Sequence, residues 1–587
     1  MRPGPVRRGC RTDRPTTGGP SDEGPDRRGA RVRRVCRPSV LVAVGLAVVA
    51  LAAPVTAGAT ARTQSGGGGG PAGTLRLSAQ QEPYCADWIA SCAGLSWGNW
   101  ILGVQTLPQA FRITPAGEYV PGPVLAGAPV LEPGPPLVVR YPINPQAKWS
   151  DGKPITAADF AYTWKQIVDG DDIYDTTGYT SIASIDTRDP KTAVVTFAQP
   201  YAAWRDLFGG FYYLLPSHLL EGRDRNKAMK DGYAFSGGPW KMQGGKRGWD
   251  KGRSLTLVPN PEYWGTVPSI AKVVFQFIPE SSAEVQALKS GQVAAAYPQP
   301  QTGMLTQFDR ADLDYVIGSG NSYEGFWFNS DAPPLDRLAV RQAVAYATDR
   351  QAIVDQIVRP AVREGRVLQS FVVPSFADYY RPAYAGYTRD LTRVDALMTG
   401  DGWAKGADGV WAKGGQRAAF AVATTTGNES RALTQQLLRS QLRQAGFELT
   451  VQNASPDLLF GKRIPQGRFV AALYAQTGTP DPGLCAVFCS QNIPTKGNGF
   501  TGQNFTRTSA PAIDAAWGAA DTQIDPAARI ASVAQGQVAL AADMASLPLF
   551  QLPTLFVWNP AQVGGPLQDN VTEGPFFNME RWMLKSG

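Results

Sequence analysis

The sequence predicts an α/β protein that folds into two or three lobes. Strand and helix patterns alternate along the chain; for example, the apolar segment 420–424 is followed by a helical period over 428–445 and another apolar segment at 447–451. The chain has 587 residues, whereas a single hydrophobic core stops growing near about 250–300 residues. More than one core is therefore expected.

Nine segments have the alternation or the short apolar runs that are typical of strands. In chain order they are 74–78, 138–144, 193–197, 254–258, 273–278, 420–424, 447–451, 547–552 and 555–558. Turn residues follow several of them, such as Asp151-Gly152 after the second strand and Asn260-Pro261 after the fourth.

Five segments have helical periodicity: a helix that begins at Thr156 and continues to Val168, then 281–290, 338–358, 428–445 and 526–543. Thr156 and Asp159 have the spacing of a capping box, which satisfies free amides at a helix start. Apolar residues between Val340 and Ile357 share one broad face, so 338–358 is predicted to be one long helix. Gly446 stands where a left-handed residue commonly ends a helix.

The net charge of +7 lies entirely at the amino-terminal end. Residues 1–60 hold 11 of the 56 basic residues and four of the 49 acidic ones, which leaves 45 of each sign in 61–587. The remainder has no net charge to attract a polyanion. We therefore expect no nucleic-acid partner.

An export signal is predicted at residues 1–61, with an extended basic prefix. Arg31, Arg33, Arg34 and Arg37 precede a 14-residue apolar run at 40–53, and small residues of the A-x-A type follow. An uncleaved anchor is the alternative, although the run is shorter than the roughly 20 residues that span a bilayer. No Cys lies between Cys36 and Cys85, so no lipobox is found. Residues 62–73 form a Gly-rich linker.

Four cysteines beyond this leader form two close pairs, Cys85 with Cys92 and Cys485 with Cys489. In an exported chain, two short-loop disulfides are the simplest interpretation, although the spacing alone does not fix their connectivity. A four-Cys zinc site is the alternative, but neither pair has the usual C-x-x-C spacing. We expect no metal.

Three sequence blocks together carry a resemblance. Residues 149–162 read WSDGKPITAADFAY, residues 238–265 begin GPWKM and end NPEYWG, and residues 328–354 read FNSDAPPLDRLAVRQAVAYATDRQAIV. In this order and spacing they resemble the extracellular solute-binding proteins of family 5, the peptide- and nickel-type receptors of ABC importers. The resemblance covers roughly residues 74–587.

The resemblance implies a two-lobed, periplasmic-binding-protein-like fold with an extra domain inserted in the first lobe. Lobe I would comprise 74–115, 215–318 and 545–587, the additional domain 116–214, and lobe II 319–544. A ligand, either an oligopeptide or another extended polar solute such as an oligosaccharide, would be enclosed between the lobes by hinge closure. A monomer without a cofactor, located outside the cytoplasm, would deliver it to membrane permease subunits.

The three blocks themselves are expected to be structural. Arg341, Asp349 and Arg350 lie on the predicted long helix, where ion pairs within the scaffold are favoured over ligand contact. The blocks therefore identify a scaffold and leave the ligand open.

One departure from the family pattern concerns the ligand's amine. In peptide-binding members, an Asp three residues before an Asp-Pro pair holds the α-ammonium group; here the pair is Asp481-Pro482, and Gly478 occupies the matched position. An enclosed ammonium without a carboxylate would lose its compensation for desolvation. The resemblance then implies either that Asp481 substitutes or that the ligand has no free α-amine.

Eight residues are candidates for ligand contact. They are Tyr84 and Trp88 after the first strand, Tyr323 and Trp327 at the expected crossing into the second lobe, and Tyr474, Gln476, Gly478 and Asp481 on a facing loop. Aromatic side chains with polar tips suit sugars or peptide planes. For each of them, packing in a core or between lobes is the alternative role.

A catalytic function is the remaining alternative, as an exported serine hydrolase. Gly94, Ser96 and Gly98 match the G-x-S-x-G pattern, but the preceding segment has no strand pattern, and the chain has a single His, His218. We expect no catalytic residue. His218 is expected to satisfy a local hydrogen bond.

Overall fold

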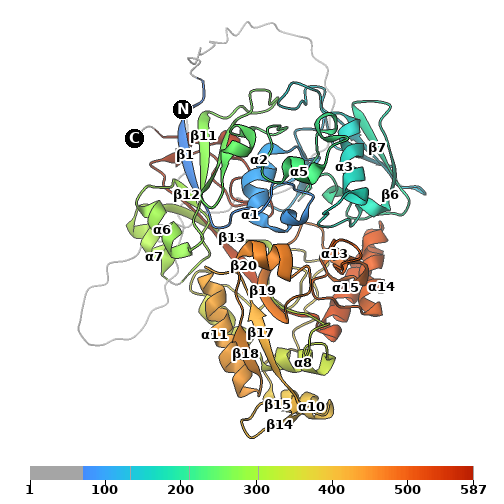
Figure 1. Cartoon of the computed structure of the whole chain (residues 1–587), viewed down its shortest axis with the longest axis vertical. Coiled ribbons are helices and arrows are strands. Elements are labelled where there is room, and N and C mark those ends of the chain that lie inside the picture. Colours follow the sequence, from blue (N-terminus) through green and yellow to red (C-terminus); the bar gives the residue numbers. More distant parts are fainter. Residues whose placement is uncertain (1–69, 133, 211, 302, 586–587) are drawn as a thin grey trace, which may run out of the picture. The chain divides into compact units, whose positions relative to one another are not determined.

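A mixed sheet of eleven strands extends through the molecule (Figure 1). The computed structural model describes residues 70–132, 134–210, 212–301 and 303–585. The order of the strands is β18 (Glu448–Val451), β17 (Ala419–Ala423), β19 (Ala471–Thr477), β13 (Asp314–Phe328), β20 (Ser546–Trp558), β12 (Ala295–Ala296), β1 (Ala72–Ala79), β11 (Ile270–Phe277), β10 (Ser254–Pro259) and β8 (Trp240–Met242), with β9 (Trp249–Asp250) also on β10.

Two long antiparallel strands, β13 and β20, connect the two ends of this sheet. Residues 314–319 of β13 pair with 553–558 of β20, and residues 323–327 pair with 546–551, with register shifts between the two stretches and at Glu324. The second stretch of β13 also pairs with β19, whereas the carboxyl end of β20 pairs with β12. Each strand therefore passes from one part of the molecule into the other.

The buried hydrophobic side chains form two large cores that define two lobes. The core of the first lobe contains Leu75, Trp149, Phe275 and Phe556, and the core of the second lobe contains Phe326, Val344, Leu473 and Leu547. A smaller cluster surrounds the helices α6 (Ser281–Lys289) and α7 (Met304–Arg310), next to β20. The predicted α/β class and the expectation of more than one core are confirmed. The exact domain bounds stay a prediction.

A separate four-stranded sheet lies inside the range expected for an additional domain. Its order is β4 (Val130–Glu132), β5 (Val138–Pro142), β7 (Thr192–Phe197) and β6 (Ile182–Asp186). Helix α3 (Ala157–Asp169) packs on it and begins with the predicted capping box, in which Asp159 Oδ2 accepts the Thr156 amide at 2.9 Å. Independence of this unit as a domain stays a prediction.

The predicted helix 338–358 is wrong as a single element. The structure has α8 (Leu338–Ala347) and α9 (Arg350–Ile357), because Asp349 leaves the helical conformation and its carboxylate accepts the Ala352 amide as a new N-cap. Thr348 contributes to the break by donating its hydroxyl to the Val344 carbonyl at 2.8 Å. The apolar periodicity continues across the break and therefore did not reveal it. The N-cap residue Asp349 was the sequence signal that could have done so.

Most other predicted elements occur within a few residues of their expected bounds. The two predicted strands 547–552 and 555–558 form the single strand β20, and the strands β13 and β19 were not predicted. The remaining strands and α-helices are β2 (Phe111–Ile113), β3 (Tyr119–Pro121), β14 (Ala404–Lys405), β15 (Trp411–Lys413), β16 (Gln416–Arg417), β21 (Val563–Gly564), β22 (Met583–Leu584), α1 (Ser96–Gly98), α2 (Val104–Thr106), α4 (Ser217–Leu220), α5 (Arg225–Met229), α10 (Leu391–Gly400), α11 (Glu429–Gln444), α12 (Pro456–Leu458), α13 (Cys485–Phe488), α14 (Pro511–Thr522) and α15 (Pro526–Asp543).

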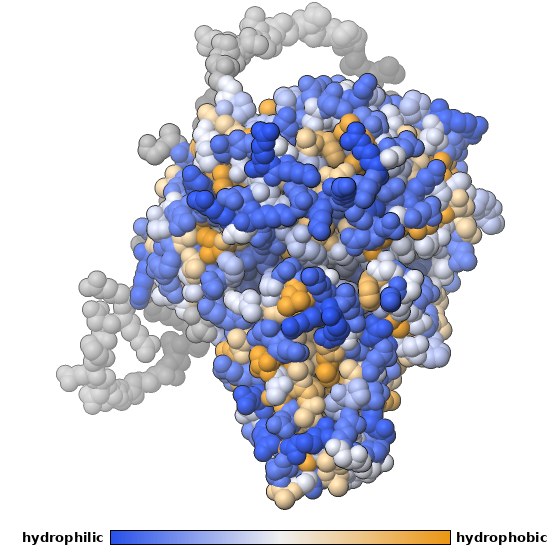
Figure 2. Space-filling model, in the orientation of Figure 1, coloured by the Kyte–Doolittle hydropathy of each residue, from blue (hydrophilic) through white to orange (hydrophobic). Residues whose placement is uncertain are grey.

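The molecular surface is largely hydrophilic on the face shown in Figure 2, and its apolar residues are scattered. Of the helices in the described ranges, none combines the length and the apolar character that crossing a membrane requires. The predicted signal at 1–61 and most of the linker at 62–73 lie outside the described residues.

Both predicted disulfides are present, as Cys85–Cys92 with a Cα separation of 5.5 Å and Cys485–Cys489 with 4.7 Å. Each closes a short loop within one lobe and stiffens a segment locally. The alternative of a four-Cys zinc site is therefore wrong.

The guanidinium of Arg350 holds together several segments of the second lobe, so its structural role agrees with the prediction, but among the described residues its partners are carbonyl oxygens and not the predicted ion pair. It donates to the carbonyls of Leu368, Pro548, Tyr384 and Tyr387 at 2.8–3.0 Å. Burial lowers its pKa to about 10, so the group remains charged at neutral pH. Arg341 likewise donates to the Asp543 and Leu335 carbonyls.

Replacement of Arg350 by Met should lower the free energy of unfolding by about 3 kcal/mol, because four carbonyls lose a hydrogen bond, three of them in buried bonds. Urea denaturation followed by circular dichroism measures the change. The control is Arg359→Ala, whose side chain is 45% exposed and whose loss should cost about 0.5 kcal/mol or less. Equal effects of the two substitutions would contradict the assigned role.

Removal of the second disulfide by Cys485→Ala with Cys489→Ala should lower stability by about 2 kcal/mol under oxidising conditions, since the unfolded chain gains entropy. Thermal unfolding with and without reductant measures this. Reductant should lower the unfolding midpoint of the double variant less than that of the wild type, because only the first disulfide is left to reduce. An unchanged reductant effect would count against it.

Candidate functional site

A cleft between the two lobes holds three adjoining cavities. The central cavity measures ≈190 Å³, and side chains of both lobes line it. A second cavity of ≈120 Å³ shares Ser96, Tyr174 and Gln476 with it, and a third of ≈420 Å³ adjoins the second at Gln80 and Asn428. The cleft is therefore elongated and continues past the central cavity.

The second lobe's wall is built on the paired strands β13 and β19. Tyr323 and Gln476 lie directly opposite each other in the ladder, and both line the central cavity. Tyr323 is 2% exposed, and its hydroxyl has no hydrogen-bond partner among the described residues. The ring of Phe371, 5.4 Å from that of Tyr323, lines the same wall.

Hydrogen bonds join the two lobes across the cleft. Gln503 of the second lobe donates to Asp175 Oδ2 at 2.7 Å, and the Gln476 amide donates to Gln503 Oε1 at 3.1 Å. Thr479 donates to Asp206 Oδ2 at 2.8 Å. Because the Gln503–Asp175 and Thr479–Asp206 bonds require both lobes, the described conformation is closed, whereas the Gln476–Gln503 bond lies within the second lobe.

Four carboxylates line the central cavity, two from each lobe. Asp175 and Asp206 belong to the first lobe, and Asp481 and Asp521 to the second. Burial and the nearby Asp481 charge raise the pKa of Asp206 to about 7 and that of Asp521 to about 8. Burial also raises the pKa of Asp175, against the effect of hydrogen bonds from Thr177 and Gln503.

Asp481 has a charged partner, because Arg529 of α15 forms an ion pair with its Oδ1. The two side chains are 11% and 10% exposed, so the pair is largely desolvated. The amide of Gly483 donates to the same carboxylate at 2.8 Å. Asp481 is thus fixed in the wall with compensated charge.

Six of the eight predicted site residues line the three cavities. Tyr323, Gln476, Gly478 and Asp481 line the central cavity, Tyr474 lines the ≈120 Å³ cavity, and Tyr84 lines the ≈420 Å³ cavity. Tyr474 and Gln476 lie on strand β19 and not on a loop as expected. Their contact with a ligand stays a prediction.

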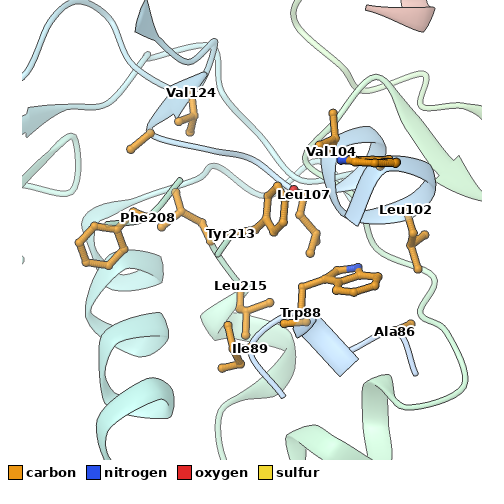
Figure 3. Close-up of a cluster of buried hydrophobic side chains, with 14 of the residues drawn as sticks. Ala86, Trp88, Ile89, Leu102, Val104, Leu107, Val124, Phe208, Tyr213 and Leu215 are labelled. Carbon is orange, nitrogen blue, oxygen red and sulfur yellow. The ribbon is translucent and has the colours of Figure 1, made fainter. Parts of the chain in front are cut away.

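Two predicted residues lie in hydrophobic cores and are not among the residues that line these cavities. Trp88 is fully buried and packs near Ile89, Leu102 and Leu215 (Figure 3). Trp327 stacks on Tyr474, with ring centroids 4.7 Å apart and planes at 7°. Aromatic composition alone did not distinguish core residues from wall residues.

Several wall residues had no recognisable signal in the sequence. Asp175, Asp206, Gln503 and Asp521 come from separate loops and a helix end, far apart in the chain. Each lies outside the three blocks that carry the family resemblance. Only folding brings them together.

Ser96 and His218, the two residues that a serine hydrolase would need, lie in different surroundings. Ser96 lines the central cavity at the start of α1, and the segment before it is the 3-10 helix Ser91–Gly94, not the strand of a nucleophile elbow. His218 pairs through Nε2 with Asp151 Oδ2 at 2.8 Å, as its predicted local role requires. Within the described ranges, no three His, Cys, Asp or Glu side chains are grouped as a metal site.

Comparisons with known proteins agree with this architecture. Residues 124–493, more than half of the chain, match the family model described as bacterial extracellular solute-binding proteins, family 5 Middle. The oligopeptide-binding protein OppA of Mycobacterium tuberculosis (strain H37Rv) is 28% identical over 76% of this chain and 75% of its own length.

Solved structures share the fold at low identity. The oligopeptide-binding protein AppA of Bacillus subtilis, in complex with a nonapeptide, has a TM-score of 0.78 at 19% identity and covers 88% of this chain and 100% of its own. The periplasmic EDTA-binding protein EppA has a TM-score of 0.76 at 23% identity and covers 88% and 97%. The predicted two-lobed binding-protein fold is therefore confirmed, and the chain belongs to the bacterial extracellular solute-binding proteins of family 5.

Proposed function

We propose that this chain captures an oligopeptide in the cleft between its lobes by hinge closure and delivers it to an ABC importer permease. The observation that carries the proposal is the central cavity, whose walls come from both lobes and are joined by hydrogen bonds across the cleft. A ligand that contacts both walls binds the closed form better and shifts the population towards it.

The strands β13 and β20 supply the hinge in this proposal. Both pass between the lobes, and the register of their pairing shifts between Ser319 and Tyr323, between the two paired stretches. An irregular ladder has fewer fixed hydrogen bonds to break when the lobes rotate. Tyr323 lies at this position and in the cavity wall, so opening of the hinge would alter the wall.

The peptide assignment is supported by the curated OppA relative and by the elongated cleft of three cavities. A non-peptide solute such as an oligosaccharide is the second candidate, and one observation favours it. At Gly478, the nearest atoms to an added Cβ would be 3.8–3.9 Å away, on Asn321. A side chain would fit there in ordinary van der Waals contact, but Gly478 supplies no carboxylate at the position where the resemblance places one in peptide-binding members.

Binding without catalysis is part of the proposal. Family 5 members are binding proteins, and His218 is engaged with Asp151. We also propose a location outside the cytoplasm, which the family description supports, together with export through the segment 1–61 and a monomeric state.

Native mass spectrometry of the purified chain should find a retained peptide. The ligand is then removed by unfolding and refolding the protein, and adding the peptide back should make the protein more compact in small-angle X-ray scattering. Ser96→Ala should leave this closure intact. A retained oligosaccharide would replace the peptide assignment with the second candidate. Loss of bound-ligand turnover in Ser96→Ala would instead support a hydrolase.

Substitution Gln476→Ala should weaken binding of the retained ligand about tenfold, since a buried polar contact to the ligand and to Gln503 is lost. Isothermal titration calorimetry measures the affinity. Gln351→Ala is the control, because Gln351 is exposed and its amide contacts Asp355 on α9. Equal affinities of the two variants would exclude Gln476 from the site.

A further inference from the structure

We propose that the central cavity selects a ligand that carries a positively charged ammonium or guanidinium group, held between Asp206 of the first lobe and Asp521 of the second. This inference names the ligand class of the binding function proposed above and rests on it. The charged group can belong to a peptide side chain or to a non-peptide cation.

The first argument is the imbalance of charge around the cavity. Four carboxylates line it, and its lining contains no Lys, Arg or His among the described residues. Arg529, just behind the wall, compensates Asp481. Closing the lobes therefore brings three further carboxyl groups into a space with one cation, which is costly unless another positive charge or protons are supplied.

The second argument is which carboxylates have partners. Both oxygens of Asp175 accept hydrogen bonds, from Thr177 at 2.7 and 2.9 Å and from Gln503 at 2.7 Å. Asp206 accepts from Thr479 at 2.8 Å and from the Tyr119 hydroxyl. In contrast, the structure gives the Asp521 carboxylate no donor among the described residues. Asp521 is therefore available to a ligand.

A buried polar group in the same wall also lacks a partner. Tyr323 lines the cavity, is 2% exposed, and has an unpaired hydroxyl within the described part of the chain. Buried hydroxyls are normally satisfied, and an unpaired one calls for an explanation. A polar ligand in this cavity would supply the partner that the hydroxyl lacks, as it would for the Asp521 carboxylate in the same wall.

Protonation shows how the closed cavity can exist without a cation. The raised pKa values of Asp206, about 7, and Asp521, about 8, mean that these carboxyls hold protons near neutral pH when the cavity is empty. The other titratable groups that face them are Asp175, Asp481, Arg529 and the tyrosines Tyr119, Tyr179 and Tyr201. Burial raises the pKa of each of these tyrosines, so they stay neutral.

A bound cation would replace these protons. Binding then releases protons below the pKa of each carboxyl, so affinity rises with pH between about 6 and 8 and levels off once both groups are ionised. The slope is about tenfold per pH unit for each proton released. A neutral ligand would produce no such rise.

Matched peptide pools test the proposal by isothermal titration calorimetry. One pool contains N-acetylated, C-amidated tripeptides with Arg or Lys at one position. The other replaces Arg by citrulline and Lys by norleucine, which keeps the size and removes the charge. The charged pool should bind at least tenfold more tightly at pH 8, and its advantage should shrink at pH 5.5.

Two variants locate the effect. Asp521→Asn and Asp206→Asn should each reduce affinity for the charged pool at least tenfold, flatten its pH dependence and leave the neutral pool unchanged. Asp169→Asn, at the exposed carboxyl end of α3, should match the wild type. Folding of each variant is checked by its thermal unfolding midpoint.

The outcomes separate this inference from the function on which it rests. Equal binding of the two pools, a neutral or anionic retained ligand, or closure by Ni²⁺ alone would overturn the charge selection while leaving a solute receptor. Absence of any retained ligand, with no closure by either pool, would contradict the receptor function as well.

Discussion

The pairing of β13 with β20 is the constraint on which the rest of the structure depends. Each strand contributes side chains to both lobes, and the sheet is continuous because these two strands pass through it. The same pairing places Tyr323 beside Gln476 at the point where the lobes meet. The scaffold and the cavity wall are consequently one feature of the backbone, so a change in strand register would displace the site.

The second constraint is that a buried charged side chain needs partners. Residues inside a lobe and residues in the cavity wall differ in how far this need is met. Within the second lobe, two buried cations have fixed partners, since Arg350 donates to four carbonyls and Arg431 pairs with Glu324 at 2.9 Å. In the cavity wall, Asp521 has no donor of this kind. A carboxylate without a donor in a cavity wall where two lobes meet is typical of a site completed by a ligand.

Local patterns predicted much of the fold. The capping box at Thr156 and Asp159, the strand–helix–strand unit around α11 and the two short-loop disulfides all occur as expected. These features depend on residues within one turn or one helix length. Strand β19 was missed because it begins as a short, wholly buried apolar run without polar alternation, and β13 was missed because glycines at 318, 320 and 325 interrupt its strand pattern.

The candidate site was predicted less completely, for a related reason. Tyr323, Gln476, Gly478 and Asp481 were identified through the family resemblance and line the central cavity, whereas Trp88 lies in a core. Asp206 and Asp521 are 315 positions apart in the numbering and had no motif. The sequence by itself determined the class of scaffold, the two close cysteine pairs and the balance of charge. Only the tertiary structure decided which carboxylates share a cavity, because their proximity depends on the approach of the two lobes and not on any local pattern.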